Sequence, residues 1–200
     1  MCYPAVLKSV LIVGLGISLV FTITATLLPD WRVSKGFRQG LFFAECHNNT
    51  QILTSSQEFL QACEEALTRP QASLVIVACL LVTSLTFSTV SFAWSIAGCC
   101  CSCVLCDFMA IGFITVISGV IELAAPIIFR LNDFPEDIAK DIKNRYERIS
   151  NSTLDVDEVK HFTDEKPQYS VHAAFIAGII LLVTSAISVC IHKVVDNESE

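Results

Sequence analysis

The chain has 200 residues, of which 53% are hydrophobic and only 16% are charged. A soluble domain of this size usually has about a quarter of its residues charged, so the composition argues against a soluble protein. The mean hydropathy of +0.60 favours a membrane protein. A net charge of −7 in that setting excludes nucleic-acid binding.

Four stretches carry almost no charge, and each is close to the ~20 residues that cross a ~30 Å hydrocarbon core. They cover residues 9–28, 72–98, 108–129 and 173–191. None shows the amphipathic period that is typical of a helix in a soluble protein. The sequence therefore predicts an all-α membrane protein with a four-transmembrane-helix bundle. A cleaved signal peptide is the alternative for the first stretch, although that stretch is longer than a usual signal core.

Two long segments, 29–71 and 130–172, bear on the orientation of the chain. They hold eleven of the thirteen basic residues, the exceptions being Lys8 and Lys193. The positive-inside rule alone would therefore place both segments in the cytosol. The same segments also contain fifteen acids, so they carry no net positive charge.

Cysteines and glycosylation sequons indicate the opposite orientation. Cys46 and Cys63 are the only cysteines in the two long segments, and an isolated pair suits a disulfide in an oxidising compartment. Sequons at Asn48 and Asn151 place one N-glycosylation acceptor in each segment. We therefore predict two extracellular loops and both termini in the cytoplasm, at the plasma membrane. The cytoplasmic parts are then the N-terminus 1–8, the turn 99–107 and the tail 192–200.

The first long loop opens with the run WRVSKGFRQGLFFAEC, residues 31–46. The residues of this run that form a recognisable motif, together with the next cysteine of the loop, are Trp31, Gly40, Leu41, Phe42, Cys46 and Cys63. In this order the chain resembles the claudin and peripheral-myelin-protein superfamily of tetraspan proteins. Members of that superfamily share a Trp soon after the first helix, then Gly-Leu-Trp, then two cysteines before the second helix.

The resemblance implies a left-handed four-helix bundle with a small extracellular β-sheet cap. It also implies that the Cys46–Cys63 disulfide cross-links two strands and that the Gly-Leu-aromatic segment dips toward the membrane surface. The rings of Trp31 and Phe42 suit the headgroup level. We interpret the run as a structural anchor more than a recognition site.

The chain departs from the claudin pattern at several places. Phe42 replaces the Trp of the motif, and residues 47–62 separate the cysteines more widely than in claudins. The second long loop is also longer, and the chain ends without the apolar residue that claudins offer to PDZ domains. The length of the second loop and the Gly-Leu-Phe sequence are similar to those of proteins in the clarin branch of the superfamily.

The predicted cytoplasmic turn is rich in cysteine. Its cysteines are Cys99, Cys100, Cys101, Cys103 and Cys106. Juxtamembrane cytosolic cysteines are typical S-palmitoylation sites, and we favour that interpretation. Unmodified cysteines are one alternative. A zinc site is another, because some of the spacings are CxxC, but no histidine lies nearby.

Glu122 is the only charged residue within a predicted membrane span. An ionisable residue in the bilayer is expensive and is a functional hypothesis by default. The simplest interpretation is a buried hydrogen bond to a Ser, a Thr or a partner helix. Contact with a cation of a partner protein, or a proton-linked function, is the alternative.

The sequence of the second long loop predicts an amphipathic helix over about 135–149. Its apolar residues recur on one helical face, at Ile138, Ile142, Tyr146 and Ile149. Pro135 suits the first position of a helix. We expect the apolar stripe to pack on the fold's own sheet, and contact with a partner is the alternative.

Catalysis has no support in the sequence, which lacks a nucleophile motif, a metal-ligand cluster and a phosphate-binding glycine loop. We therefore expect no catalytic or metal site, no cofactor and no small-molecule substrate. A transporter would need more intramembrane polar residues than Glu122, or broken helices and internal repeats.

The predicted function is therefore non-enzymatic and depends on protein–protein contacts at the cell surface, within the lipid bilayer. One class is a protein of cell adhesion, cell–cell junctions or membrane organisation that associates with itself. Charges in its first loop would then bias ion passage, namely Arg32, Lys35, Arg38, Glu64 and Glu65. The alternative is an auxiliary or trafficking subunit of an ion channel or receptor. Fold alone does not choose between these classes.

Overall fold

The computed structural model describes residues 3–33, 37–46, 57–67, 72–100, 108–132, 135–150 and 168–199. Four long helices form an elongated bundle: α1 (Tyr3–Leu27), α3 (Ala72–Cys100), α4 (Phe108–Asn132) and α7 (Tyr169–Ser199). Each contains a stretch long and apolar enough to cross a bilayer, with mean hydropathies between 2.1 and 2.6. The prediction of a multi-pass protein with four apolar helices is confirmed.

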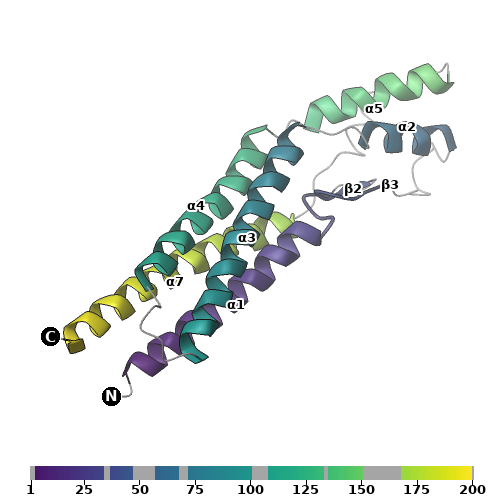
Figure 1. Cartoon of the computed structure of the whole chain (residues 1–200). Coiled ribbons are helices and arrows are strands. Elements are labelled where there is room, and N and C mark those ends of the chain that lie inside the picture. Colours follow the sequence, from purple (N-terminus) through teal and green to yellow (C-terminus); the bar gives the residue numbers. More distant parts are fainter. Residues whose placement is uncertain are drawn as a thin grey trace.

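The bundle helices extend beyond the apolar stretches that the sequence marks out. The fourth helix begins at Tyr169 and runs to Ser199, whereas its apolar stretch covers 173–191. A helix continues past the hydrocarbon boundary because its backbone hydrogen bonds form equally well in the polar region. The starts of α1 and α4 and the ends of α3 and α7 lie at one end of the bundle (Figure 1).

The opposite end of the bundle carries a cap made of a small sheet and two short helices (Figure 1). The strands β1 (Arg32–Val33), β2 (Phe37–Gln39) and β3 (Ala44–Cys46) form an antiparallel sheet in the order β1-β2-β3. In this register Arg32 faces Gln39 and Phe37 faces Cys46. The helices are α2 (Gln57–Leu67) and α5 (Pro135–Ser150). The predicted small sheet and the helix near 135–149 are therefore present.

The first long loop contains a helix that we did not expect. Leu60, Cys63 and Leu67 recur at a helical period, with Glu64 and Glu65 on the other face, so α2 is amphipathic. Cys63 therefore lies on a helix. The expectation that the disulfide links two strands is wrong, because the bond joins β3 to α2.

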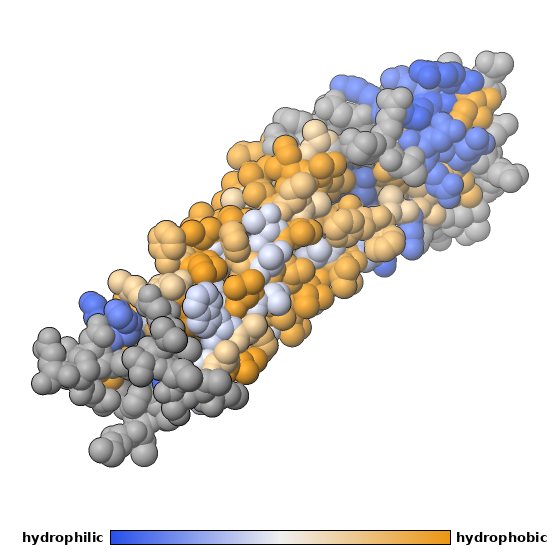
Figure 2. Space-filling view, in the orientation of Figure 1, coloured by the Kyte–Doolittle hydropathy of each residue, from blue (hydrophilic) through white to orange (hydrophobic). Residues whose placement is uncertain are grey.

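Buried apolar residues gather in three clusters. The cap cluster comprises Phe37, Ala62, Cys63, Ala66, Leu67, Ile142 and Tyr146. The junction cluster, at the cap end of the bundle, comprises Ala25, Trp31, Leu74, Val77, Leu81, Ala125, Phe129, Val171, Ala173 and Ala174. The distal cluster, toward the other end, comprises Leu11, Leu15, Phe108, Ile111, Leu181 and Ile191. On the face shown in Figure 2, an apolar belt of side chains covers the bundle helices, and hydrophilic side chains replace it at the cap.

Candidate functional site

Trp31 joins the cap to the bundle. It follows α1 directly, and its side chain is fully buried in the junction cluster among residues of all four bundle helices. Its indole Nε1 donates a hydrogen bond to the Ala25 carbonyl oxygen at 2.7 Å. The ring meets Phe129 edge-on, with centroids 5.2 Å apart and an interplanar angle of 74°. The ring therefore contacts protein at the end of the bundle, where the sequence alone suggested the headgroup level.

The Gly40-Leu41-Phe42 segment forms a tight turn against the end of α1. The Gly40 N–H donates to the Phe43 carbonyl oxygen at 2.7 Å. A Cβ atom at position 40 would lie 2.7 Å from Pro29 Cα and 3.1 Å from the Leu28 carbonyl oxygen, so only glycine permits this approach. Leu41 packs against the junction cluster, whereas Phe42 and Phe43 are 54% and 61% exposed.

Arg32 and Gln39 form a buried polar link beside Trp31. The Arg32 Nη1 donates to Gln39 Oε1 at 3.1 Å, across the register pair that joins β1 to β2. The Arg32 guanidinium also lies 5.3 Å from the centroid of Phe129, in a cation–π arrangement. Gln39 Nε2 donates to the Leu67 carbonyl oxygen at 3.5 Å, near the end of α2. Arg32 is therefore buried, and its contacts connect the first two strands of the cap to the bundle.

The disulfide Cys46–Cys63 closes the cap, and α5 covers it. The bond spans 17 residues of sequence, and Cys63 is fully buried in the cap cluster. Ile142 and Tyr146 of α5 are buried in the same cluster, and Ile149 packs against it. The apolar stripe of α5 therefore packs on this chain's own cap, mainly on α2. The side chain of Ile138, also predicted for this stripe, lies outside the described residues.

One arginine connects the two cap helices electrostatically. Arg145 of α5 contacts Glu65 of α2 at 3.3 Å and Asp141 at 3.2 Å. The second contact is the i,i+4 pair that the sequence suggests. Of the other loop-one charges predicted to bias ion passage, Arg38 and Glu64 are exposed on the cap, and Lys35 lies outside the described residues.

Glu122 of α4 is fully buried within the bundle and contacts a cluster of serines. Its Oε2 accepts a hydrogen bond from the Ser84 hydroxyl of α3. The Ser118 hydroxyl lies 2.9 Å from that of Ser84 and 2.8 Å from that of Ser88. A buried hydrogen bond to serine, the simplest of the interpretations open for Glu122, is therefore the arrangement in this structure.

The serines around Glu122 follow a regular spacing that the sequence analysis missed. On α3 the buried polar residues are Ser84, Ser88, Ser91 and Ser95, at steps of four, three and four. This spacing is that of a helix–helix seam. On α4 the matching positions are Thr115, Ser118 and Glu122. Small polar residues at such a seam allow close packing and hydrogen bonds between helices in a membrane.

Glycines bring α4 and α7 close together. A Cβ atom on Gly119 would lie 3.2 Å from the Gly178 carbonyl oxygen, and one on Gly178 would lie 3.2 Å from the Gly119 carbonyl oxygen. Gly112 likewise faces Ser188 of α7. These small-residue positions are thus used inside the bundle of one chain.

Several predicted sites lie outside the described residues. They are the sequons at Asn48 and Asn151 and the cysteines Cys101, Cys103 and Cys106. Cys99 and Cys100 form the end of α3, but their side chains are not described. Glycosylation, palmitoylation and the zinc alternative therefore stay predictions. Among the described residues, no group of three or more His, Cys, Asp or Glu side chains could hold a metal ion.

No protein-family model matches the chain, and no curated protein matches it either. The class of the protein therefore follows from its own structure. It is a multi-pass membrane protein with four apolar helices and a disulfide-closed cap at one end.

Proposed function

We propose that the chain is a non-enzymatic, claudin-like tetraspan protein that acts through protein–protein contacts in cell adhesion, at junctions or in membrane organisation. One observation carries this proposal. The cap has its own apolar core and its own disulfide, and Trp31 fixes it to the bundle, so it presents a preformed polar surface beyond the apolar belt (Figure 2). A preformed surface binds a partner with little loss of conformational entropy.

Kinship with the claudin-like superfamily is supported by where the motif residues lie. Trp31, Gly40 and Leu41 meet at the junction between cap and bundle, and Cys46 and Cys63 close the cap beside it. The residues that carry the resemblance are thus those that hold the two regions together. The strand-to-helix disulfide and the α2–α5 helix pair are the features in which the chain differs from the expected pattern.

The proposed orientation places the cap outside the cell and both termini in the cytoplasm. A disulfide persists in an oxidising compartment, and this one closes the cap. The start of α1 and the end of α7 lie at the opposite end of the bundle (Figure 1). In the chain, Asn48 falls between β3 and α2, and Asn151 directly follows α5, so both predicted glycosylation sites belong to the segments of the cap.

A cell-mixing experiment tests the adhesion proposal. Cells that express the full chain with one of two fluorescent tags are mixed, and enrichment at contacts between two expressing cells is compared with contacts to non-expressing cells. We expect enrichment only where both cells express the chain. Reversing the exposed cap charges Glu64 and Lys140 should reduce this enrichment, whereas reversing Lys193 at the far end should not. Equal intensity at both kinds of contact would exclude adhesion between copies.

A second candidate function is the auxiliary or trafficking subunit of a channel or receptor. Phe42 and Phe43 favour it, because they are exposed beside Leu41, where the cap meets the bundle. Apolar rings at that position suit side-by-side contact with another protein in the same membrane. Purification from native membranes in a mild detergent tests this candidate. A channel or receptor near equal stoichiometry that is lost on Phe42→Ala and Phe43→Ala would support it, and recovery of the chain alone would exclude it.

A further inference from the structure

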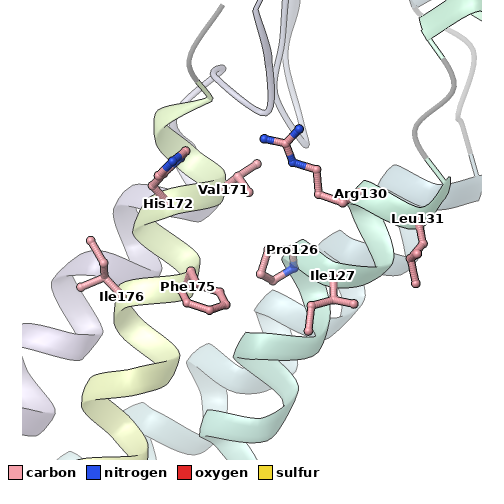
Figure 3. Close-up of a pocket in the computed structure, with 8 residues that line it drawn as sticks. All are labelled: Pro126, Ile127, Arg130, Leu131, Val171, His172, Phe175 and Ile176. Carbon is pink, nitrogen blue, oxygen red and sulfur yellow. The ribbon is translucent and has the colours of Figure 1, made fainter.

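A groove opens on the surface of the bundle between α4 and α7, next to the cap (Figure 3). Its volume is about 430 Å³, which is within the range of about 300–1,000 Å³ for small-molecule sites. Pro126 of α4 and Phe175 of α7 point toward each other across it, and Ile127 and Val171 extend its walls (Figure 3). The walls are therefore almost entirely apolar.

The position of the groove follows from how the two helices pack. Their backbones approach closely at Gly119 and Gly178. The groove lies on the cap side of this contact, where Pro126 and Phe175 replace the glycines. No side chain of the described residues fills the space between these walls. In a bilayer the groove therefore faces the acyl chains of the surrounding lipid.

The rim of the groove has a different chemistry from its walls. Arg130 lies one helical turn from Ile127 toward the cap, and its guanidinium projects over the groove (Figure 3). His172 lies at the same rim, with its Nδ1 2.8 Å from the Gln168 carbonyl oxygen. Among the residues that the structure describes, those that line the groove include no acid. The rim therefore attracts an anion.

The depth of the rim in the membrane indicates which anion. The apolar stretch of α4 ends at Leu131 and that of α7 begins at Tyr169, so Arg130 and His172 lie at the border between the apolar belt and the polar cap. Phosphate groups of lipids occupy this level of a bilayer. A guanidinium matches the geometry of a phosphate and can donate two parallel hydrogen bonds to it.

We propose that this groove is a binding site for one phospholipid of the cap-side leaflet. Its acyl chain lies between Pro126, Ile127 and Phe175, and its phosphate contacts the guanidinium of Arg130. The groove combines apolar walls with a positively charged rim at headgroup depth. A lipid without a phosphate lacks the group that would bind this rim.

The test uses the full chain reconstituted in vesicles of digalactosyldiacylglycerol, a bilayer lipid without a phosphate, that contain a small fraction of a phosphatidylcholine with a photoreactive group in its acyl chain. After illumination, mass spectrometry locates the labelled residues. We expect labelling of the groove residues Ile127 and Phe175 well above that of Val120, which is exposed on the same helix but outside the groove. Arg130→Gln should reduce groove labelling about tenfold, because it removes a charge-assisted hydrogen bond. Arg148→Gln, which removes an exposed arginine of α5, should leave it unchanged.

A second pair of variants tests the apolar part without changing a charge. Ile127→Trp narrows the groove and should reduce labelling of Phe175, whereas Val120→Trp should not. Competition separates the lipid classes: added phosphatidylcholine should displace the probe, and diacylglycerol, which lacks the phosphate, should not. Equal labelling at Ile127 and Val120, insensitivity to Arg130→Gln, or displacement by cholesterol as effective as by phosphatidylcholine would each overturn the proposal.

Discussion

The bundle buries many polar side chains beside its apolar clusters, whereas the described core of the cap is mostly apolar. In the bundle, serines, threonines and Glu122 lie inside, while residues such as Phe113 and Val120 face outward. In the cap, Phe37, Ile142 and Tyr146 lie inside, and charged residues such as Glu64 and Lys140 face outward. Lipid is as apolar as leucine, so burying apolar residues gives the bundle little driving force, and packing with hydrogen bonds replaces it. The cap, surrounded by water, depends on the hydrophobic effect and a disulfide.

The two regions meet at Trp31, which belongs to both. Its indole is hydrogen-bonded to α1 and packs on Phe129 of α4, and the strand that begins at Arg32 follows it directly. A position shared by two differently stabilised regions should be the most sensitive in the molecule. The predictions below follow from this contrast, from the largest expected effect to the smallest.

Replacing Trp31 by alanine should destabilise the protein by about 3–5 kcal/mol, the usual cost of deleting a buried Trp or Phe. The loss should appear as a lower unfolding temperature in detergent and as reduced delivery to the cell surface. Trp94 offers a matched control, because it is 40% exposed on the bundle surface. If Trp94→Ala were as damaging as Trp31→Ala, the junction would have no special importance.

Breaking the disulfide should affect the cap and spare the bundle. Cys46→Ser or Cys63→Ser should each lower the free energy of unfolding by about 3 kcal/mol, the stabilisation that the chain-entropy model gives for a loop of this size. Non-reducing gel mobility and limited proteolysis of α2 and α5 would detect the change. Cys79→Ser, which removes an exposed free cysteine of α3, serves as the control. Equal effects from Cys79→Ser would contradict this account.

Removing the carboxyl group from the interior of the bundle should cost about 1–3 kcal/mol, because it leaves buried hydroxyls without an acceptor. Glu122→Leu tests this, with thermal unfolding in nanodiscs as the measurement. Glu122→Gln keeps an acceptor oxygen for Ser84 and should stay closer to the wild type. A Leu variant at least as stable as the Gln variant would show that the hydrogen bonds contribute nothing.

The ion pairs between the cap helices should matter least. Arg145→Gln removes the contacts to Glu65 and Asp141, and a solvent-exposed pair is worth about 0–1 kcal/mol. A shift in unfolding temperature smaller than that of Cys46→Ser, and reduced further by added salt, is the expected result. A larger shift than for the disulfide would reverse the proposed order of stabilising contributions in the cap.

The sequence predicts the membrane helices well because a bilayer sets their length and forbids charge over that length. The pairing of Cys46 with Cys63 is also predictable, since no other cysteine lies in the long loops. The length and composition of one segment suffice to predict a membrane helix, and the disulfide has a single possible pair of cysteines. The α5 helix belongs to the same group, because its period and its Pro135 are local features.

Other features depended on contacts between distant residues. The partner of Glu122 was predictable as a serine or threonine, but Ser84 in particular depends on how α3 and α4 align. The burial of Arg32 could not be predicted, because its partner Gln39 and the ring of Phe129 come from other elements. The helix α2 was missed although Leu60, Cys63 and Leu67 have a helical period, since the family resemblance led us to expect strands there.

The central claim is that the cap faces the outside of the cell, where it contacts other proteins. Labelling of lysines by a membrane-impermeant reagent tests it most directly, because Lys140 is exposed on α5 and Lys193 is exposed near the opposite end of the bundle. On intact cells that express the full chain, Lys140 should be modified and Lys193 should react only after permeabilisation. Modification of Lys193 on intact cells with Lys140 protected would place the cap in the cytosol and contradict the account.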